Sequence, residues 1–215
     1  MAFDHEEQEQ LASLKSWWKQ YGNLLTWALV VVLLAYSGWT GWNLYQRNQA
    51  AQAAVLYNEA QTAGQMRDNA KLQRVTTDMQ DKFGRTAYAQ MASLLAARSA
   101  WDANDPATAK KQLQWVVDHG QDEEFKVLAR IRLAGVLADE KKFDEAMKLL
   151  ASDVPAQFAS AIADRRGDVL VAQQKKDEAR AAYKLALEKS DPKNPAKQLI
   201  QLKLDALGGT ENSAG

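Results

Sequence analysis

The residue types that most often perform chemistry are scarce in this chain. It contains no cysteine and only two histidines, His5 and His119, which lie far apart in the sequence. The lack of a thiol excludes a cysteine nucleophile and a disulfide scaffold, and neither histidine has a companion ligand at the spacing of common zinc sites. The sequence therefore predicts no catalytic residue, no metal site and no cofactor.

Motifs and charge support the same interpretation. The chain has no Gly-rich phosphate loop, no G-x-S-x-G and no H-E-x-x-H. Its carboxylates stand beside Lys and Arg in helical segments, which is typical of solvated helix surfaces. The 27 basic and 27 acidic residues balance, and a neutral chain is not a generic nucleic-acid binder. We expect a binding protein without enzymatic activity.

The apolar residues that would position such a protein are concentrated near the N-terminus. Residues 20–46, between Lys19 and Arg47, carry no charged side chain, and residues 24–42 read LLTWALVVVLLAYSGWTGW. As a helix this core is about 28 Å long, close to the hydrocarbon thickness of a bilayer. Aromatic residues favour the two membrane–water interfaces. They flank the core at Trp17, Trp18, Tyr21, Trp39, Trp42 and Tyr45. We predict one transmembrane helix over residues 20–46.

Two other interpretations of this segment are open. A cleaved signal peptide is one, because Ala35 and Ser37 are small residues two apart after an apolar run. The acidic leader MAFDHEEQEQ and the continuation of the apolar run through Trp39 and Trp42 argue against cleavage. A buried helix of a soluble core is the other, and the length and aromatic ends argue against it. An uncleaved anchor is favoured.

The basic residues near the ends of the segment indicate its orientation. Lys15 and Lys19 precede it, whereas only Arg47 follows it before Arg67. The excess of positive charge favours a cytoplasmic N-terminus. Residues 1–19 are then a short cytoplasmic tail, and the part of the chain after the span lies outside the cytoplasm. We expect residues 208–215 to be a disordered tail.

Residues 47–207 are rich in helix formers and lack alternating β-branched runs, so this part is expected to be all-α. Three stretches share one spacing: a small residue, an alanine twelve residues later in the next helix, and a larger residue one turn on. These are Ala97, Ala109 and Leu113; Ala134, Ala146 and Leu150; and Gly167, Ala179 and Tyr183. The spacing is that of tetratricopeptide repeats, in which small residues permit close helix contact. We predict a tetratricopeptide-like solenoid of helical hairpins, with any array of Ala-rich helices as the alternative.

The first helices of such repeats line the side that binds partners. Met91, Leu94, Arg98 and Trp101 share one face of the predicted helix over residues 87–101, and Asp164 and Asp168 form part of a dense polar run. Methionine, tryptophan and arginine are common at binding surfaces. These six residues are a predicted partner groove. The alternative is that Leu94 and Trp101 pack under the preceding hairpin and that the aspartates pair with neighbouring charges.

In their order along the chain, these features resemble the family of ancillary subunits of the bacterial SecYEG translocon. The resemblance rests on the acidic N-terminal tail, the Gly-Trp-Thr-Gly-Trp run at residues 38–42 and the Ala/Gln-rich helix after it. Residues 162–170, IADRRGDVL, and residues 198–207, QLIQLKLDAL, are similar to later parts of the family. The resemblance covers nearly the full chain, but no single motif in it is as specific as a metal-ligand signature.

The resemblance implies a single-pass protein of the bacterial inner membrane with a periplasmic tetratricopeptide-like domain. It implies association with SecYEG and with a membrane-anchored periplasmic chaperone of the prolyl-isomerase-like type. It also implies a role in passing unfolded client polypeptides to periplasmic folding factors, and it brings no catalytic residues. Two alternatives are a scaffold for another cell-envelope assembly complex and a cleaved, soluble periplasmic binding module.

Overall fold

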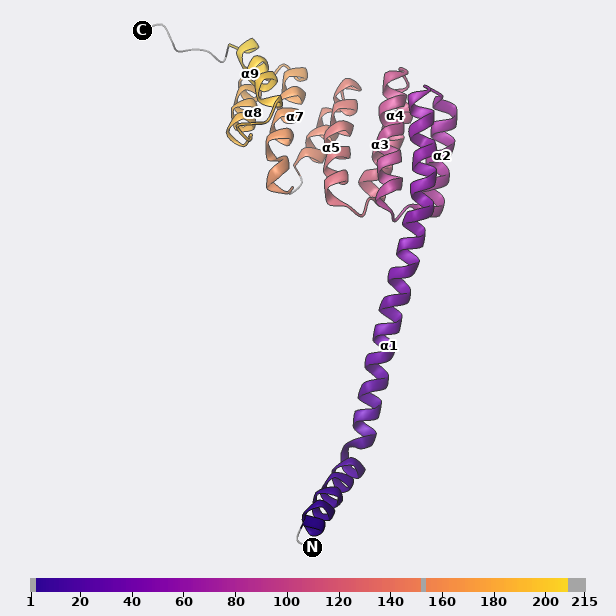
Figure 1. Cartoon of the computed structure of the whole chain (residues 1–215). Helices are drawn as coiled ribbons and strands as arrows, with labels where there is room; N and C mark the ends of the chain where they lie inside the picture. The colour runs from indigo at the N-terminus through magenta and orange to yellow at the C-terminus, as the bar shows by residue number, and fades with distance from the viewer. Residues whose placement is uncertain (1–2, 152–153, 209–215) are drawn as a thin grey trace, which may run out of the picture. The chain divides into compact units, whose positions relative to one another are not determined.

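The computed structural model describes residues 3–151 and 154–208. Within these residues the chain is helical and contains no strand (Figure 1). The helices are α1 (Phe3–Gln65), α2 (Asn69–Phe83), α3 (Ala87–Asp102), α4 (Pro106–His119), α5 (Glu123–Asp139), α6 (Phe143–Leu150), the 3-10 turn η1 (Ala156–Phe158), α7 (Ala159–Ala172), α8 (Lys176–Glu188) and α9 (Ala196–Ala206). The tail predicted to be disordered lies outside the described residues, apart from Gly208.

The internal contacts divide the chain into two units, Met1–Gln49 and Ala50–Gly215. The first unit holds most of α1, including the uncharged segment. Its large apolar side chains are exposed, Trp27 for example to 65%. Two hydroxyls inside the segment donate to carbonyls one turn back, from Thr26 to Gly22 and from Thr40 to Tyr36. A hydroxyl that donates its proton to a carbonyl of its own helix needs no water molecule as an acceptor.

Among the described residues, α1 is the only helix long and apolar enough to cross a membrane, and none of that apolar stretch is buried. The predicted interface aromatics Trp17, Trp18, Tyr21, Trp39, Trp42 and Tyr45 are all exposed. Trp17 lies 5.8 Å from Tyr21 and Trp42 lies 6.0 Å from Tyr45, measured between ring centroids. Because water-soluble proteins seldom expose so large a continuous apolar surface, this helix has the properties of a membrane anchor.

The second unit consists of helical hairpins that follow one another in chain order, closed by α9 (Figure 1). The hairpins are α3 with α4, α5 with α6, and α7 with α8. The last turns of α1 share an apolar cluster with α2 and form a further, N-terminal hairpin. Each of the four turns holds one residue with positive φ, at Arg67 (59°), Asn104 (58°), Lys141 (60°) and Gln174 (63°). Each turn residue lies seven positions after a small residue, namely Ala60, Ala97, Ala134 or Gly167.

The turns share their hydrogen bonds as well as their dihedral angles. In each, the N–H after the left-handed residue donates to a carbonyl of the first helix, over 2.8–2.9 Å. The pairs are Asp68 to Ala63, Asp105 to Ala100, Lys142 to Leu137 and Lys175 to Leu170. This left-handed ending satisfies carbonyls that the end of a helix would otherwise leave unpaired. The three predicted repeats therefore have a fourth, N-terminal counterpart that the sequence did not reveal.

Small residues lie at the centre of each hairpin. The predicted packing residues Ala97, Ala109, Ala134, Ala146, Gly167 and Ala179 are all buried. Their larger partners Leu113, Leu150 and Tyr183 are buried beside them. In the first hairpin, formed by the end of α1 and α2, Ala60 takes the first small position. Leu72 stands where the other hairpins have alanine. The result is a core that runs along the stack as three clusters of apolar side chains.

Candidate partner-binding groove

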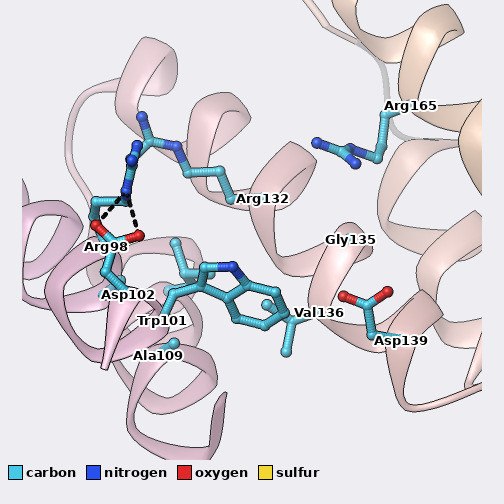
Figure 2. A pocket seen from close by; sticks show the side chains of 11 residues that line it. Arg98, Trp101, Asp102, Ala109, Arg132, Gly135, Val136, Asp139 and Arg165 are labelled. Atoms are coloured by element: carbon cyan, nitrogen blue, oxygen red, sulfur yellow. Dashed lines mark hydrogen bonds and ion pairs between the residues drawn. The ribbon is translucent and has the colours of Figure 1, made fainter. Parts of the chain in front are cut away.

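The first helices of successive hairpins contact one another, α3 with α5 and α5 with α7. A pocket of about 420 Å³ opens where these three helices meet (Figure 2). It is lined by Ala97, Arg98, Trp101, Asp102, Ala109, Leu113, Arg132, Gly135, Val136, Asp139 and Arg165. Below, this pocket is called the groove.

Two predicted groove residues, Arg98 and Trp101, line it. The Trp101 side chain is 42% exposed, and Figure 2 shows its indole ring lying across the middle of the groove. The Arg98 Nε–H donates to both carboxylate oxygens of Asp102, over 2.9 and 2.8 Å. The groove therefore offers an open aromatic face beside a charged pair.

Met91 and Leu94 do not line the groove. Leu94 is only 6% exposed and belongs to the central apolar cluster, together with Ala97. The two share a face because they are three residues apart on one helix. Met91 is half-buried on α3, outside the groove. The prediction that all four residues form one binding face is corrected: Leu94 packs in the core, as the alternative interpretation had it.

Asp164 and Asp168 also lie outside the groove, in contact with the last helix. The Lys203 ammonium of α9 is 2.8 Å from Asp164 Oδ1 and 2.8 Å from Asp168 Oδ1. The Tyr183 hydroxyl donates to Asp168 Oδ1 over 2.9 Å. Burial and the negative charge of Asp168 raise the pKa of Tyr183, so this phenol remains a donor. These aspartates connect α7 to α8 and α9, and the expectation that they face a groove is corrected.

Six residues that line the groove were not foreseen from the sequence: Asp102, Arg132, Gly135, Val136, Asp139 and Arg165. A Cβ on Gly135 would lie 3.3 Å from Arg165 Nη1 and 3.4 Å from its Cζ, so the missing side chain makes room for the guanidinium. Arg132 is exposed at the surface, but partial desolvation of its guanidinium, and then the charge of Arg98, lower its pKa. Arg132 and Arg165 each stand two residues before the small residue of their repeat, a regularity that could have revealed them.

A second pocket, of about 580 Å³, adjoins the groove and shares Arg98 and Asp102 with it. It extends past Ser99 and Asn69 to Gly64 and Arg67 at the first hairpin. Within the described ranges, no three His, Cys, Asp or Glu residues are grouped so as to hold a metal ion. The chemistry that both pockets offer is ion pairing, hydrogen bonding and stacking, which is the chemistry of polypeptide recognition.

Comparison with known proteins agrees with this architecture. Residues 15–209 match the family described as tetratricopeptide repeat-like domain. Three curated proteins named "Ancillary SecYEG translocon subunit" are similar over nearly their whole length. The protein from Neisseria gonorrhoeae is 34% identical over 211 residues, covering 96% of this chain and 100% of its own. That from Escherichia coli is 29% identical, covering 96% and 99%, and that from Haemophilus influenzae is 28% identical, covering 96% and 100%.

An apolar, unburied N-terminal helix, a stack of tetratricopeptide-like hairpins and end-to-end similarity to these proteins occur in one chain. The chain belongs to the family of ancillary SecYEG translocon subunits, with a tetratricopeptide repeat-like domain.

Proposed function

We propose that this protein is a membrane-anchored accessory subunit of the SecYEG translocon that binds other polypeptides through its hairpin domain. The observation that carries the proposal is the similarity over 96% of the chain to a protein named as such a subunit, including the anchor-like helix as well as the hairpins. A likeness confined to the hairpins would support only a generic binding module, because such repeats serve many unrelated partners.

The proposed topology places residues 1–19 in the cytoplasm, residues 20–46 in the inner membrane and residues 47–207 in the periplasm. The exposed apolar side chains of α1 support a span, since lipid is the solvent in which their exposure costs least. The excess of Lys15 and Lys19 over Arg47 supports the orientation. The bilayer is thus itself a partner, through the six interface aromatics.

The proposed role is to link emerging, unfolded client polypeptides to a membrane-anchored periplasmic chaperone of the prolyl-isomerase-like type. A tether near the translocon exit raises the effective concentration of the hairpin domain for each emerging chain, so weak contacts suffice. An accessible groove with an open tryptophan and charged pairs fits such weak, adaptable binding. The role requires no catalysis, and we propose that the protein is not an enzyme.

Site-specific photo-crosslinking in intact cells tests the proposal. A photoreactive residue at Val31, in the apolar segment, and one at Val55, which is 69% exposed, should capture subunits of SecYEG. A third at Trp101 should capture the chaperone or client chains. The matched control is Arg74, an exposed residue of α2 outside both pockets. Exclusive capture of other envelope proteins would instead favour a scaffold for a different assembly complex, and release of the protein by osmotic shock would favour a cleaved soluble module.

A further inference from the structure

The groove and the pocket beside it contain one arginine from each of the four hairpins: Arg67, Arg98, Arg132 and Arg165. Among the described residues, two carboxylates line the same surface, those of Asp102 and Asp139. One of them, Asp102, is held by Arg98. The surface along the first helices therefore carries an excess of positive charge, although the whole chain is neutral.

Two of these arginines have hydrogen-bonding capacity that no described residue uses. Over the described residues, no side-chain hydrogen bond or ion pair reaches Arg132. Arg165 donates from Nη1 to Asp168 over 3.2 Å, but its Nε is buried and has no acceptor. Figure 2 shows the Arg165 guanidinium extending from α7 toward the groove. A buried guanidinium N–H without an acceptor is costly, so an anionic group that reaches Arg165 is favoured, and a second can pair with the exposed Arg132.

The floor between the arginines is apolar. The indole ring of Trp101 and the side chain of Val136 lie below the two guanidinium groups in Figure 2. Because Gly135 has no side chain, Arg165 lies close to the backbone of α5 and leaves the groove open. A ligand that fills this space needs a carboxylate next to an apolar group.

We propose that the groove binds an extended acidic segment of a partner polypeptide, with one carboxylate at Arg132, another at Arg165 and an apolar side chain between them on Trp101. The inference rests on the proposed function and specifies the chemistry of its partner. The second pocket provides space for the segment to continue, with a further carboxylate toward Arg67. Planar guanidinium groups pair with carboxylates through two parallel hydrogen bonds, which favours arginine over lysine here.

The mixed charge of the surface favours a peptide over an anionic lipid headgroup. Asp139 lines the groove and, in the described part of the chain, its carboxylate accepts no hydrogen bond and forms no ion pair, so it would repel a phosphate. A peptide backbone, in contrast, supplies N–H donors for that carboxylate as well as acidic side chains for the arginines. An elongated surface spanning several hairpins also fits an extended chain better than a compact headgroup.

The test uses the full-length protein in neutral detergent and a fluorescently labelled peptide, Glu-Leu-Asp-Glu-Leu-Asp. The control peptide, Gln-Leu-Asn-Gln-Leu-Asn, has the same shape without carboxylates. We expect the acidic peptide to bind at least about tenfold more tightly than its amide counterpart, and the difference to shrink as salt is added. Arg132→Gln and Trp101→Ala should each weaken peptide binding about tenfold. Arg132→Lys keeps the positive charge and should therefore weaken binding less than Arg132→Gln does. The control is Arg166→Gln, an exposed arginine of α7 outside the groove.

Circular dichroism and thermal unfolding of each variant separate lost binding from lost folding, and Arg132 is exposed enough for its replacement to leave the fold intact. Equal binding of the two peptides, or equal loss in the Arg132→Gln and Arg166→Gln proteins, would overturn the proposal. So would Arg132-dependent binding to nanodiscs containing phosphatidylglycerol without binding to the peptide, which would assign the groove to lipid. Since SecYEG is absent from this assay, its failure leaves the crosslinking test of translocon association unaffected.

Discussion

The ring of Tyr183 on α8 occupies the space where a side chain at Gly167 on α7 would begin. A Cβ built on Gly167 would overlap three atoms of the Tyr183 ring, and both residues are buried. The two positions are the small and large members of the third predicted repeat. Glycine therefore stands at residue 167 for space rather than for backbone freedom, because this residue lies within a regular helix.

Replacing Gly167 by alanine should destabilise the hairpin domain although alanine is the better helix former. Overpacking against the Tyr183 ring should cost about 1–3 kcal/mol of unfolding free energy. Gly135→Ala is the matched control, because only the flexible end of Arg165 is near its Cβ, and it should be neutral or slightly stabilising. Chemical denaturation measures the unfolding free energy of both variants. In a Tyr183→Ala background the penalty of Gly167→Ala should largely disappear, and an unchanged penalty there would show that the ring is not its cause.

A buried glutamine joins α4 to α2. Gln112 accepts from Gln80 Nε2 over 2.6 Å and donates to Gln73 Oε1 over 2.8 Å, with its own side chain buried. Gln112→Leu should cost about 1–3 kcal/mol, because two partly buried amides lose a partner. Gln114→Leu, on the exposed face of the same helix, should change stability little. Equal denaturation midpoints for the two variants would contradict a stabilising role for this bridge.

The phenol of Tyr183 should make the domain sensitive to alkali. Burial and Asp168 raise its pKa above the unfolded value of 10.0. The folded state therefore keeps the proton at pH values where the unfolded state releases it. This contribution to stability is fully present below about pH 10 and is lost as the pH rises through the folded pKa. The unfolding free energy measured at rising pH should show this decline in the wild type and a shallower decline in Tyr183→Phe. Parallel curves for the two proteins would show that ionisation of Tyr183 does not cause the decline.

The membrane anchor is tested by placing charge in it. Arginine near the middle of a spanning helix costs about 3 kcal/mol per residue. Val31→Arg combined with Leu34→Arg should therefore move much of the protein out of the fraction that alkaline washing leaves in membranes. Val55→Arg, on the part of α1 that belongs to the hairpin unit, should leave retention unchanged. Full retention of the doubly substituted protein in washed membranes would show that the apolar stretch does not anchor the protein in the bilayer.

Much of the fold was predictable because tight helix contact leaves few choices of residue. Ala134, Gly167 and their partners repeat at a fixed spacing since a larger side chain would collide, as the ring of Tyr183 shows. The first hairpin escaped notice because Leu72 replaces the second alanine, although Arg67 adopts the same turn as its three counterparts. Its backbone and its first small residue, Ala60, follow the pattern, while its second small position does not.

The groove was less predictable, because it depends on which faces of neighbouring helices meet. Arg98 and Trp101 were found from spacing on a single helix. Arg132 and Arg165 join them only through packing of α5 and α7, and each alone resembles an ordinary surface charge. The partner of Asp164 is Lys203, 39 residues along the chain, which local spacing does not indicate.

Purification of the full-length protein from membranes in mild detergent tests the central claim most directly. The comparison protein carries an unrelated single-span helix in place of residues 20–46. The native protein should bring SecYEG with it in defined proportion. The exchanged protein should bring markedly less, because in the proposed arrangement the span and its flanking aromatics place the domain beside the channel. Recovery of the native protein without SecYEG, while it remains folded and membrane-bound, would contradict the account.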